Sequence, residues 1–180
     1  MLHFKAVLNV LEANDIPYTI GGSLLLSLKG LPVIPSDVDI LVESKIFASA
    51  HEVIRSYATA FEDKPAQGRF LTEACTTFTL ADRLQVDLMT GFAIAHEADR
   101  FEMRFTIEKA ETHAGLLPLS SMEAWYVMYW LLPGKEAKRA LMEDYFLKGG
   151  LADRECLKQA LMLGLPAEAS HAIKDLLTNT

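Results

Sequence analysis

Apolar residues recur with helical or strand spacing along the first two thirds of the chain. Helical spacing predicts a helix over 4–14, a short apolar helix after Ser23, and a longer helix over 44–60. Alternation of apolar and polar residues is typical of half-buried strands. The expected strands are 17–20, 37–42, 70–80, 83–89, 101–107 and 112–117, with a polar loop at 63–68 and irregular chain at 92–100.

From residue 120 onward the pattern is helical, and either Ser120 or Ser121 is suited to cap the first helix of this part. That helix is rich in aromatic residues, whose spacing favours a core-facing helix over a platform that stacks a base or sugar. Further helices are expected over 135–147, 152–163 and 167–177, separated by glycine and proline. The sequence therefore predicts a mixed α/β core over 1–118 followed by a helical subdomain over 119–180.

A glycine turn joins the 17–20 strand to the short apolar helix. Gly21 and Gly22 end the strand, and Ser23 is expected to be the helix N-cap. Backbone amides at a helix start bind phosphate well, and the Ser23 hydroxyl would add a donor. A Gly-Gly-Ser sequence alone is most often an ordinary turn.

Asp37 and Asp39 are two residues apart on an expected strand, which places both side chains on one face, about 6.6–6.8 Å apart along the chain. Val38 and Ile40 then face the core. Two carboxylates so placed repel each other unless a cation lies between them, and carboxylates are ligands that divalent metal ions prefer. An isolated Asp-x-Asp is more often a solvated strand end.

Asp87 is the best candidate for a third carboxylate. It lies on the polar face of the alternating segment 83–89, with Val86 and Leu88 on the other face. Taken alone, it is expected to be a surface residue. Next to the Asp37 strand, however, it would complete a site for two-metal phosphoryl chemistry.

The glycine turn, the apolar helix, the Asp-x-Asp strand and the later strand aspartate occur in an order that resembles the signature of the nucleotidyltransferase superfamily. Members have the DNA polymerase beta-like fold and include aminoglycoside and minimal nucleotidyltransferases. The resemblance covers about half of the chain. It implies an α/β (α+β) fold, with a mixed sheet, flanking helices and a C-terminal helical bundle.

The resemblance also implies transfer of a nucleoside monophosphate from an NTP, expected to be ATP, to a hydroxyl acceptor with release of pyrophosphate. Asp37, Asp39 and Asp87 would be catalytic and would bind Mg²⁺ or Mn²⁺, with Asp87 also acting as general base. The nucleotide-binding residues implied or suggested are Gly21, Gly22, Ser23, Ser36, Lys29 and Lys138.

One departure concerns the residues before Asp37. Many members have a basic residue shortly before the Asp-x-Asp, whereas the segment 31–36 has Ser36 but no arginine or lysine. Lys29 is the nearest basic replacement and is equally consistent with a solvated lysine. Lys138, in the helical part, is a candidate phosphate ligand, although an ordinary charged helix face is the simpler interpretation.

The composition of the chain argues against some classes of binding partner. The chain has 180 residues, is 51% hydrophobic and carries a net charge of −7, which argues against a general DNA or RNA groove. No apolar run is long enough to span a membrane. Cys75 and Cys156 are far apart in sequence and have no metal-ligand spacing, so a reduced cytoplasmic protein is expected.

Two alternatives to an active enzyme stay open. One is a catalytically inactive module of the same fold that binds a nucleotide or a protein, and the other is a component of a toxin–antitoxin pair. A homodimer or a small helical protein partner is compatible with either. The sequence names neither the acceptor nor the preferred base.

Overall fold

The computed structural model describes residues 3–97 and 99–180. Within these residues the strands form a seven-stranded mixed sheet and a separate two-stranded hairpin. The strands are β1 (Thr19–Ile20), β2 (Asp37–Leu41), β3 (Ala58–Asp63), β4 (Ala74–Leu80), β5 (Gln85–Thr90), β6 (Ala93–His96), β7 (Asp99–Glu102), β8 (Glu108–Thr112) and β9 (Gly115–Leu119). The helices are α1 (His3–Ala13), α2 (Gly22–Leu28), α3 (Ser44–Arg55), α4 (Met122–Leu131), α5 (Glu136–Gly149), α6 (Arg154–Ala160) and α7 (Ala167–Asn179).

The sheet order β3-β4-β5-β2-β1-β9-β8 places β2 and β5 next to each other near the centre. These two strands are parallel, while β5 runs antiparallel to β4 and β2 runs antiparallel to β1. Val38, Ile40, Val86 and Leu88 are buried, so the apolar face of both strands contributes to the core as their alternation predicts. The mixed α/β architecture expected from the sequence is confirmed.

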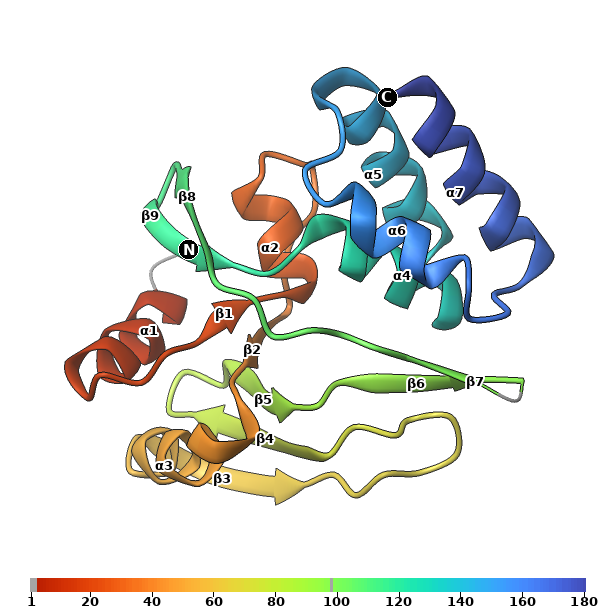
Figure 1. Cartoon of the computed structure of the whole chain (residues 1–180). Helices are drawn as coiled ribbons and strands as arrows, with labels where there is room; N and C mark the ends of the chain where they lie inside the picture. Colours follow the sequence, from red (N-terminus) through yellow and green to blue (C-terminus); the bar gives the residue numbers. More distant parts are fainter. Residues whose placement is uncertain (1–2, 98) are drawn as a thin grey trace.

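Six of the seven helices in the described residues lie in two groups, and α2 contacts both β2 and α4 (Figure 1). α1 and α3 pack together beside the sheet, and α4 to α7 form a helical bundle beyond β9. α4 is the central helix of that bundle: Trp125, Tyr126, Val127 and Tyr129 are all at most 3% exposed. The core-facing interpretation of the aromatic helix is therefore confirmed, and burial on all sides is typical of an interior helix. In the part of the chain that the structure describes, no helix is long and apolar enough to cross a bilayer.

Several expected elements are wrong in extent or type. The helix predicted over 44–60 ends at Arg55, and Ala58–Asp63 is instead the edge strand β3, whose exposed residues give little alternation. Residues 92–100, expected to be irregular, contain β6 and part of β7, and the strand expected over 101–107 ends at Glu102. The strand expected over 112–117 is β9, shifted to Gly115–Leu119, with β8 before it.

Caps are the least reliable feature of the prediction. Gly21, not Ser23, occupies the N-cap of α2, so Ser23 lies within the first helical turn and makes no capping bond. At α4 the prediction of a serine cap is confirmed, because the Ser121 hydroxyl accepts a hydrogen bond of 3.1 Å from the Ala124 amide.

Candidate functional site

The three candidate carboxylates are brought together by the pairing of β2 with β5. Asp39 lies opposite Asp87 in the parallel register, and Asp37 lies opposite Gln85. Asp37 and Asp39 point to the same side of β2, since Val38 between them is buried in the core. The side chains predicted from sequence to share one polar face therefore do so on adjacent strands.

The glycine turn lies directly against this carboxylate face. Gly22 has a φ of +58°, and a Cβ atom built on it would lie 1.6 Å from Oδ2 of Asp39. Gly21 is closed in on another side, because its Cβ would lie 2.2 Å from the indole ring of Trp125. The Gly21 amide donates a hydrogen bond of 2.9 Å to the Asp39 carbonyl, so this N–H is not free for a ligand. Only residues without a side chain fit at these two positions.

Ser23 meets a lysine from the helical bundle. The Lys138 ammonium donates a hydrogen bond to the Ser23 hydroxyl across 115 positions of sequence. Burial and the neighbouring Lys135 lower the pKa of Lys138, while Asp37 and Asp39 oppose that shift. The Tyr129 hydroxyl also faces Ser23, and burial raises its pKa.

A cavity of about 530 Å³ contains these groups. Its floor includes the three carboxylates, one wall carries Tyr129, Lys135 and Lys138 from the helical part, and another is formed by the chain after β3. Its lining includes Ser23, Ser36, Asp37, Asp39, Asp87, Lys64, Phe70, Phe92, Trp125, Tyr129, Lys135 and Lys138. A volume of this size is typical of small-molecule sites.

Three predicted site residues are not part of the cavity lining: Gly21 and Gly22, which pack against Trp125 and Asp39, and Lys29. Lys29 is the C-cap of α2, at the opposite end of the helix from Ser23, and it lines a separate small cavity with Ser120 and Gly149. Residues at the two ends of one helix point to different regions, so proximity of Lys29 to Asp37 in sequence is not proximity in space.

The surroundings of Asp39 raise the pKa of its carboxyl group. Burial and, to a smaller extent, the charges of Asp37 and Asp87 raise its pKa to about 7, against the opposing effect of Lys138 and Lys135. A buried carboxylate facing two others is a strong acceptor for a divalent cation, so the donor set fits Mg²⁺ or Mn²⁺. Within residues 3–97 and 99–180, however, no three His, Cys, Asp or Glu side chains form a ready-made ligand cluster. Any bound metal would need further ligands from a substrate or from solvent.

Comparison with solved structures identifies the fold. No family model matches the sequence, and no curated protein matches it. A proposed nucleotidyltransferase from Thermotoga maritima matches with a TM-score of 0.60 at 17% identity, covering 81% of this chain and 91% of that one. The chain has the nucleotidyltransferase fold.

Two structures of the antibiotic-resistance factor ANT(2'')-Ia have the same fold. The one in complex with adenylyl-2''-tobramycin matches with a TM-score of 0.53 at 12% identity, covering 96% of this chain and 92% of that one. The solution structure matches with a TM-score of 0.53 at 10% identity, covering 97% and 87%. At these identities the likeness is one of fold.

Two residues that contact Asp87 were not identified from the sequence as site candidates. The Thr77 hydroxyl, on β4, donates a hydrogen bond to Oδ1 of Asp87, and Lys64 lies 3.5 Å from the same oxygen. Thr77 lies opposite Asp87 in the antiparallel register of β4 with β5. The strands expected over 70–80 and 83–89 are separated by only two residues, which favours their pairing and was a usable signal for Thr77, whereas nothing in the pattern around Lys64 separated it from a solvated loop residue.

Proposed function

We propose that this protein is a metal-dependent nucleotidyltransferase that moves an NMP from an NTP, expected to be ATP, to a hydroxyl acceptor. The observation that carries the proposal is the pairing of Asp39 with Asp87 on adjacent parallel strands, with Gly22 packed against Asp39. This arrangement puts acidic ligands in one cavity and a close-approach turn against them, which is what metal-assisted phosphoryl chemistry requires.

Asp37 and Asp39 would hold Mg²⁺ or Mn²⁺, with Asp87 sharing a second ion. The metal would neutralise phosphate charge and align the reacting groups. The pairing of β2 with β5 holds the three carboxylates in fixed positions, so a metal ion bound to them would be fixed in position as well. Because Asp39 is buried and faces two like charges, it gains more from a bound cation than an exposed carboxylate would.

The opposite side of the cavity would hold the phosphates. The Ser23 hydroxyl and the Lys138 ammonium already meet there, and the amides of Gly22 and Ser23 belong to the first helical turn, which has no intrahelical acceptors. Ser36 lines the same cavity next to Asp37. Gly21 contributes space for Trp125 rather than a donor, since its amide is bonded within the sheet.

Asp87 would act as general base on the acceptor hydroxyl. The hydroxyl proton passes to the Asp87 carboxylate while the acceptor oxygen forms a bond to the α-phosphorus. The bond from that phosphorus to the bridging oxygen breaks on the opposite side, and pyrophosphate leaves. The Thr77 hydroxyl, bonded to one oxygen of Asp87, fixes the orientation of the carboxylate for this transfer.

The test is pyrophosphate release from each NTP with Mg²⁺ and a pool of hydroxyl acceptors. Asp39→Ala is expected to abolish release with the fold retained, while Asp144→Asn on the exposed face of α5 keeps the wild-type rate. An unchanged rate in Asp39→Ala removes Asp39 from the mechanism.

An inactive nucleotide-binding module is the second candidate, and the absence of a basic residue over 31–36 favours it. The three carboxylates that line the cavity weigh against it, because they are the metal ligands that turnover would require. Nucleotide binding without pyrophosphate release would select the module. ATP as the preferred nucleotide, a cytoplasmic location, a protein partner and the division at residue 118 stay predictions.

A further inference from the structure

Lys64 reaches the candidate site from the chain after β3, whereas Lys135 and Lys138 belong to the helical part. Its Nζ lies 3.5 Å from Oδ1 of Asp87, a charge pair at the long end of hydrogen-bond distances. No motif led to this residue, which directly follows the edge strand β3.

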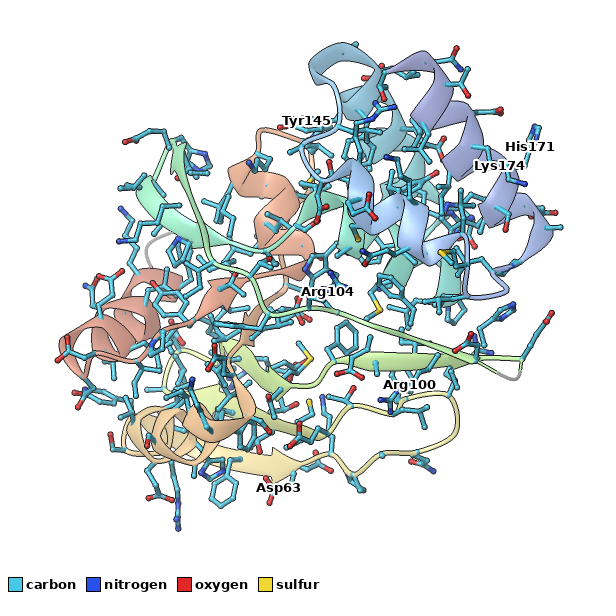
Figure 2. The ribbon with its side chains drawn as sticks, in the orientation of Figure 1. Asp63, Arg100, Arg104, Tyr145, His171 and Lys174 are labelled. Carbon is cyan, nitrogen blue, oxygen red and sulfur yellow. The ribbon has the colours of Figure 1, made fainter. Side chains whose placement is uncertain are left out.

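The main chain around Lys64 is fixed. Its amide donates a hydrogen bond of 2.8 Å to the Cys75 carbonyl on β4, and the preceding Asp63, labelled at the end of β3 in Figure 2, accepts one of 2.6 Å from the Thr76 hydroxyl. Because β4 lies between β3 and β5, the lysine side chain must pass over a whole strand to reach Asp87. Strands two apart are separated by about 9.5 Å, a span that a long extended side chain covers and a short one does not.

Asp87 is consequently held twice through one oxygen. Oδ1 accepts a hydrogen bond from the Thr77 hydroxyl and faces the Lys64 ammonium. A cation bound at Asp87 would meet the Lys64 ammonium at this carboxylate. An ammonium and a divalent ion cannot both lie against the same carboxylate oxygen without strong repulsion.

We propose that Lys64 is a positioning residue for Asp87. The Lys64 ammonium takes the place of a second cation beside the Asp87 carboxylate until a metal ion displaces it. The proposal rests on the proposed function, since it assumes that Asp37, Asp39 and Asp87 form the metal site. Lys64 balances the charge of Asp87 and holds this carboxylate in one orientation before substrate arrives. The two cations compete, so metal binding at Asp87 is weaker than the three carboxylates alone would give.

The experiment titrates the metal-free protein with Mn²⁺ and follows free Mn²⁺ by its electron paramagnetic resonance signal. Lys64→Met is expected to bind Mn²⁺ about five- to tenfold more tightly at the weaker site than the wild type does. Lys64→Arg, which keeps the charge, stays within about twofold of the wild type. Lys64 is half exposed, so both variants are expected to fold, and Lys64→Gln is a second neutral variant.

Lys135→Met is the matched control, because it removes one positive charge from the same cavity without touching Asp87. A tightening in Lys64→Met and Lys64→Gln that is absent from Lys135→Met supports the proposal. Equal Mn²⁺ affinity in wild type and Lys64→Met overturns it, and so does an equal gain in Lys135→Met, which would show a general charge effect.

Failure of the proposed function gives a different result. If the wild type binds no Mn²⁺ and Asp39→Asn changes nothing, the carboxylates are not a metal site and both proposals fall. If the wild type binds Mn²⁺ through Asp39 while Lys64→Met leaves the affinity unchanged, only the role of Lys64 is lost.

Discussion

Gly22 has no Cβ atom, and both its backbone conformation and its contact with the carboxylate site require this. Its φ of +58° already disfavours any other residue, and the space that a Cβ would need is filled by the Asp39 carboxylate. Glycine is required here by contact as well as by conformation, and the two causes are separable by experiment.

Gly22→Ala is expected to destabilise the protein by more than the cost of the left-handed backbone alone. That cost is about 1–2 kcal/mol, and displacing Asp39 adds roughly another 1–3 kcal/mol of overpacking. Gly164→Ala is the matched control, because Gly164 has the same φ of +58° and nothing within 4 Å of its would-be Cβ. The measurement is urea unfolding of both variants, and equal losses would show that Asp39 moves away at no cost.

Asp39→Asn is expected to change how stability depends on pH in the absence of metal. Burial and the charges of Asp37 and Asp87 raise the pKa of Asp39 to about 7 from an ordinary value of 3.8. Between these values the unfolded chain has released a proton that the folded protein still holds, so folded stability falls as pH rises through this window. Asparagine does not titrate, so the variant lacks this fall.

The gain in Asp39→Asn over wild type is therefore small near pH 4 and reaches the order of 2–4 kcal/mol above pH 7, measured by urea unfolding with a chelator present. Asp144→Asn, which removes an exposed carboxylate on α5, controls for general charge and is expected to show no such pH-dependent gain. A gain that is constant with pH would mean that Asp39 is not the group that titrates.

At the scale of elements, the site depends on α5 as well as on the sheet. α2 contributes Ser23 and α5 contributes Lys138, so the cavity is completed only when the helical bundle packs beside the sheet. The burial of Trp125 against Gly21 fixes α4 in the same junction.

Lys138→Met is expected to weaken NTP binding about 10- to 100-fold, because a hydrogen bond to a charged group contributes about 1.5–3 kcal/mol. The control is Lys148→Met, near the end of the same helix, where the lysine is 74% exposed and pairs with Asp144. Isothermal titration with an NTP and Mg²⁺ measures both. Equal affinities in the two variants would assign Lys138 to an ordinary charged helix face.

The strongly patterned elements were predictable from sequence, and the reasons are visible in β2 and β5. Both strands alternate cleanly because one face is buried, and that alternation placed Asp37, Asp39 and Asp87 on the polar face. β3 has an exposed edge position and so carries no alternation to detect. Lys64 and Lys138 enter the site through tertiary packing, which periodicity along the chain cannot encode.

At the scale of the whole molecule, an acidic protein with a net charge of −7 must bind a polyanion through local charge. Lys64, Lys135 and Lys138 all line the cavity, but five acidic residues line it too, so under the proposed function a bound metal ion is expected to be what makes the site attract phosphate. These acidic residues are Asp37, Asp39, Glu62, Asp63 and Asp87. Nucleotide binding should therefore depend strictly on the divalent ion.

Thermal unfolding with each NTP, with and without Mg²⁺, measures this dependence. At 100 times its Kd a ligand adds about 2.7 kcal/mol, which corresponds to a rise in Tm of about 5–10 °C for a chain of this length. The rise is expected only with Mg²⁺ in the wild type and in Asp144→Asn, and is lost in Asp39→Asn. The ligand-induced shift is the relevant quantity, because Asp39→Asn by itself raises the Tm of the metal-free protein. A shift that survives without Mg²⁺ would place the nucleotide away from the carboxylates, and no shift with any NTP would leave this fold as a scaffold for a partner other than a nucleotide.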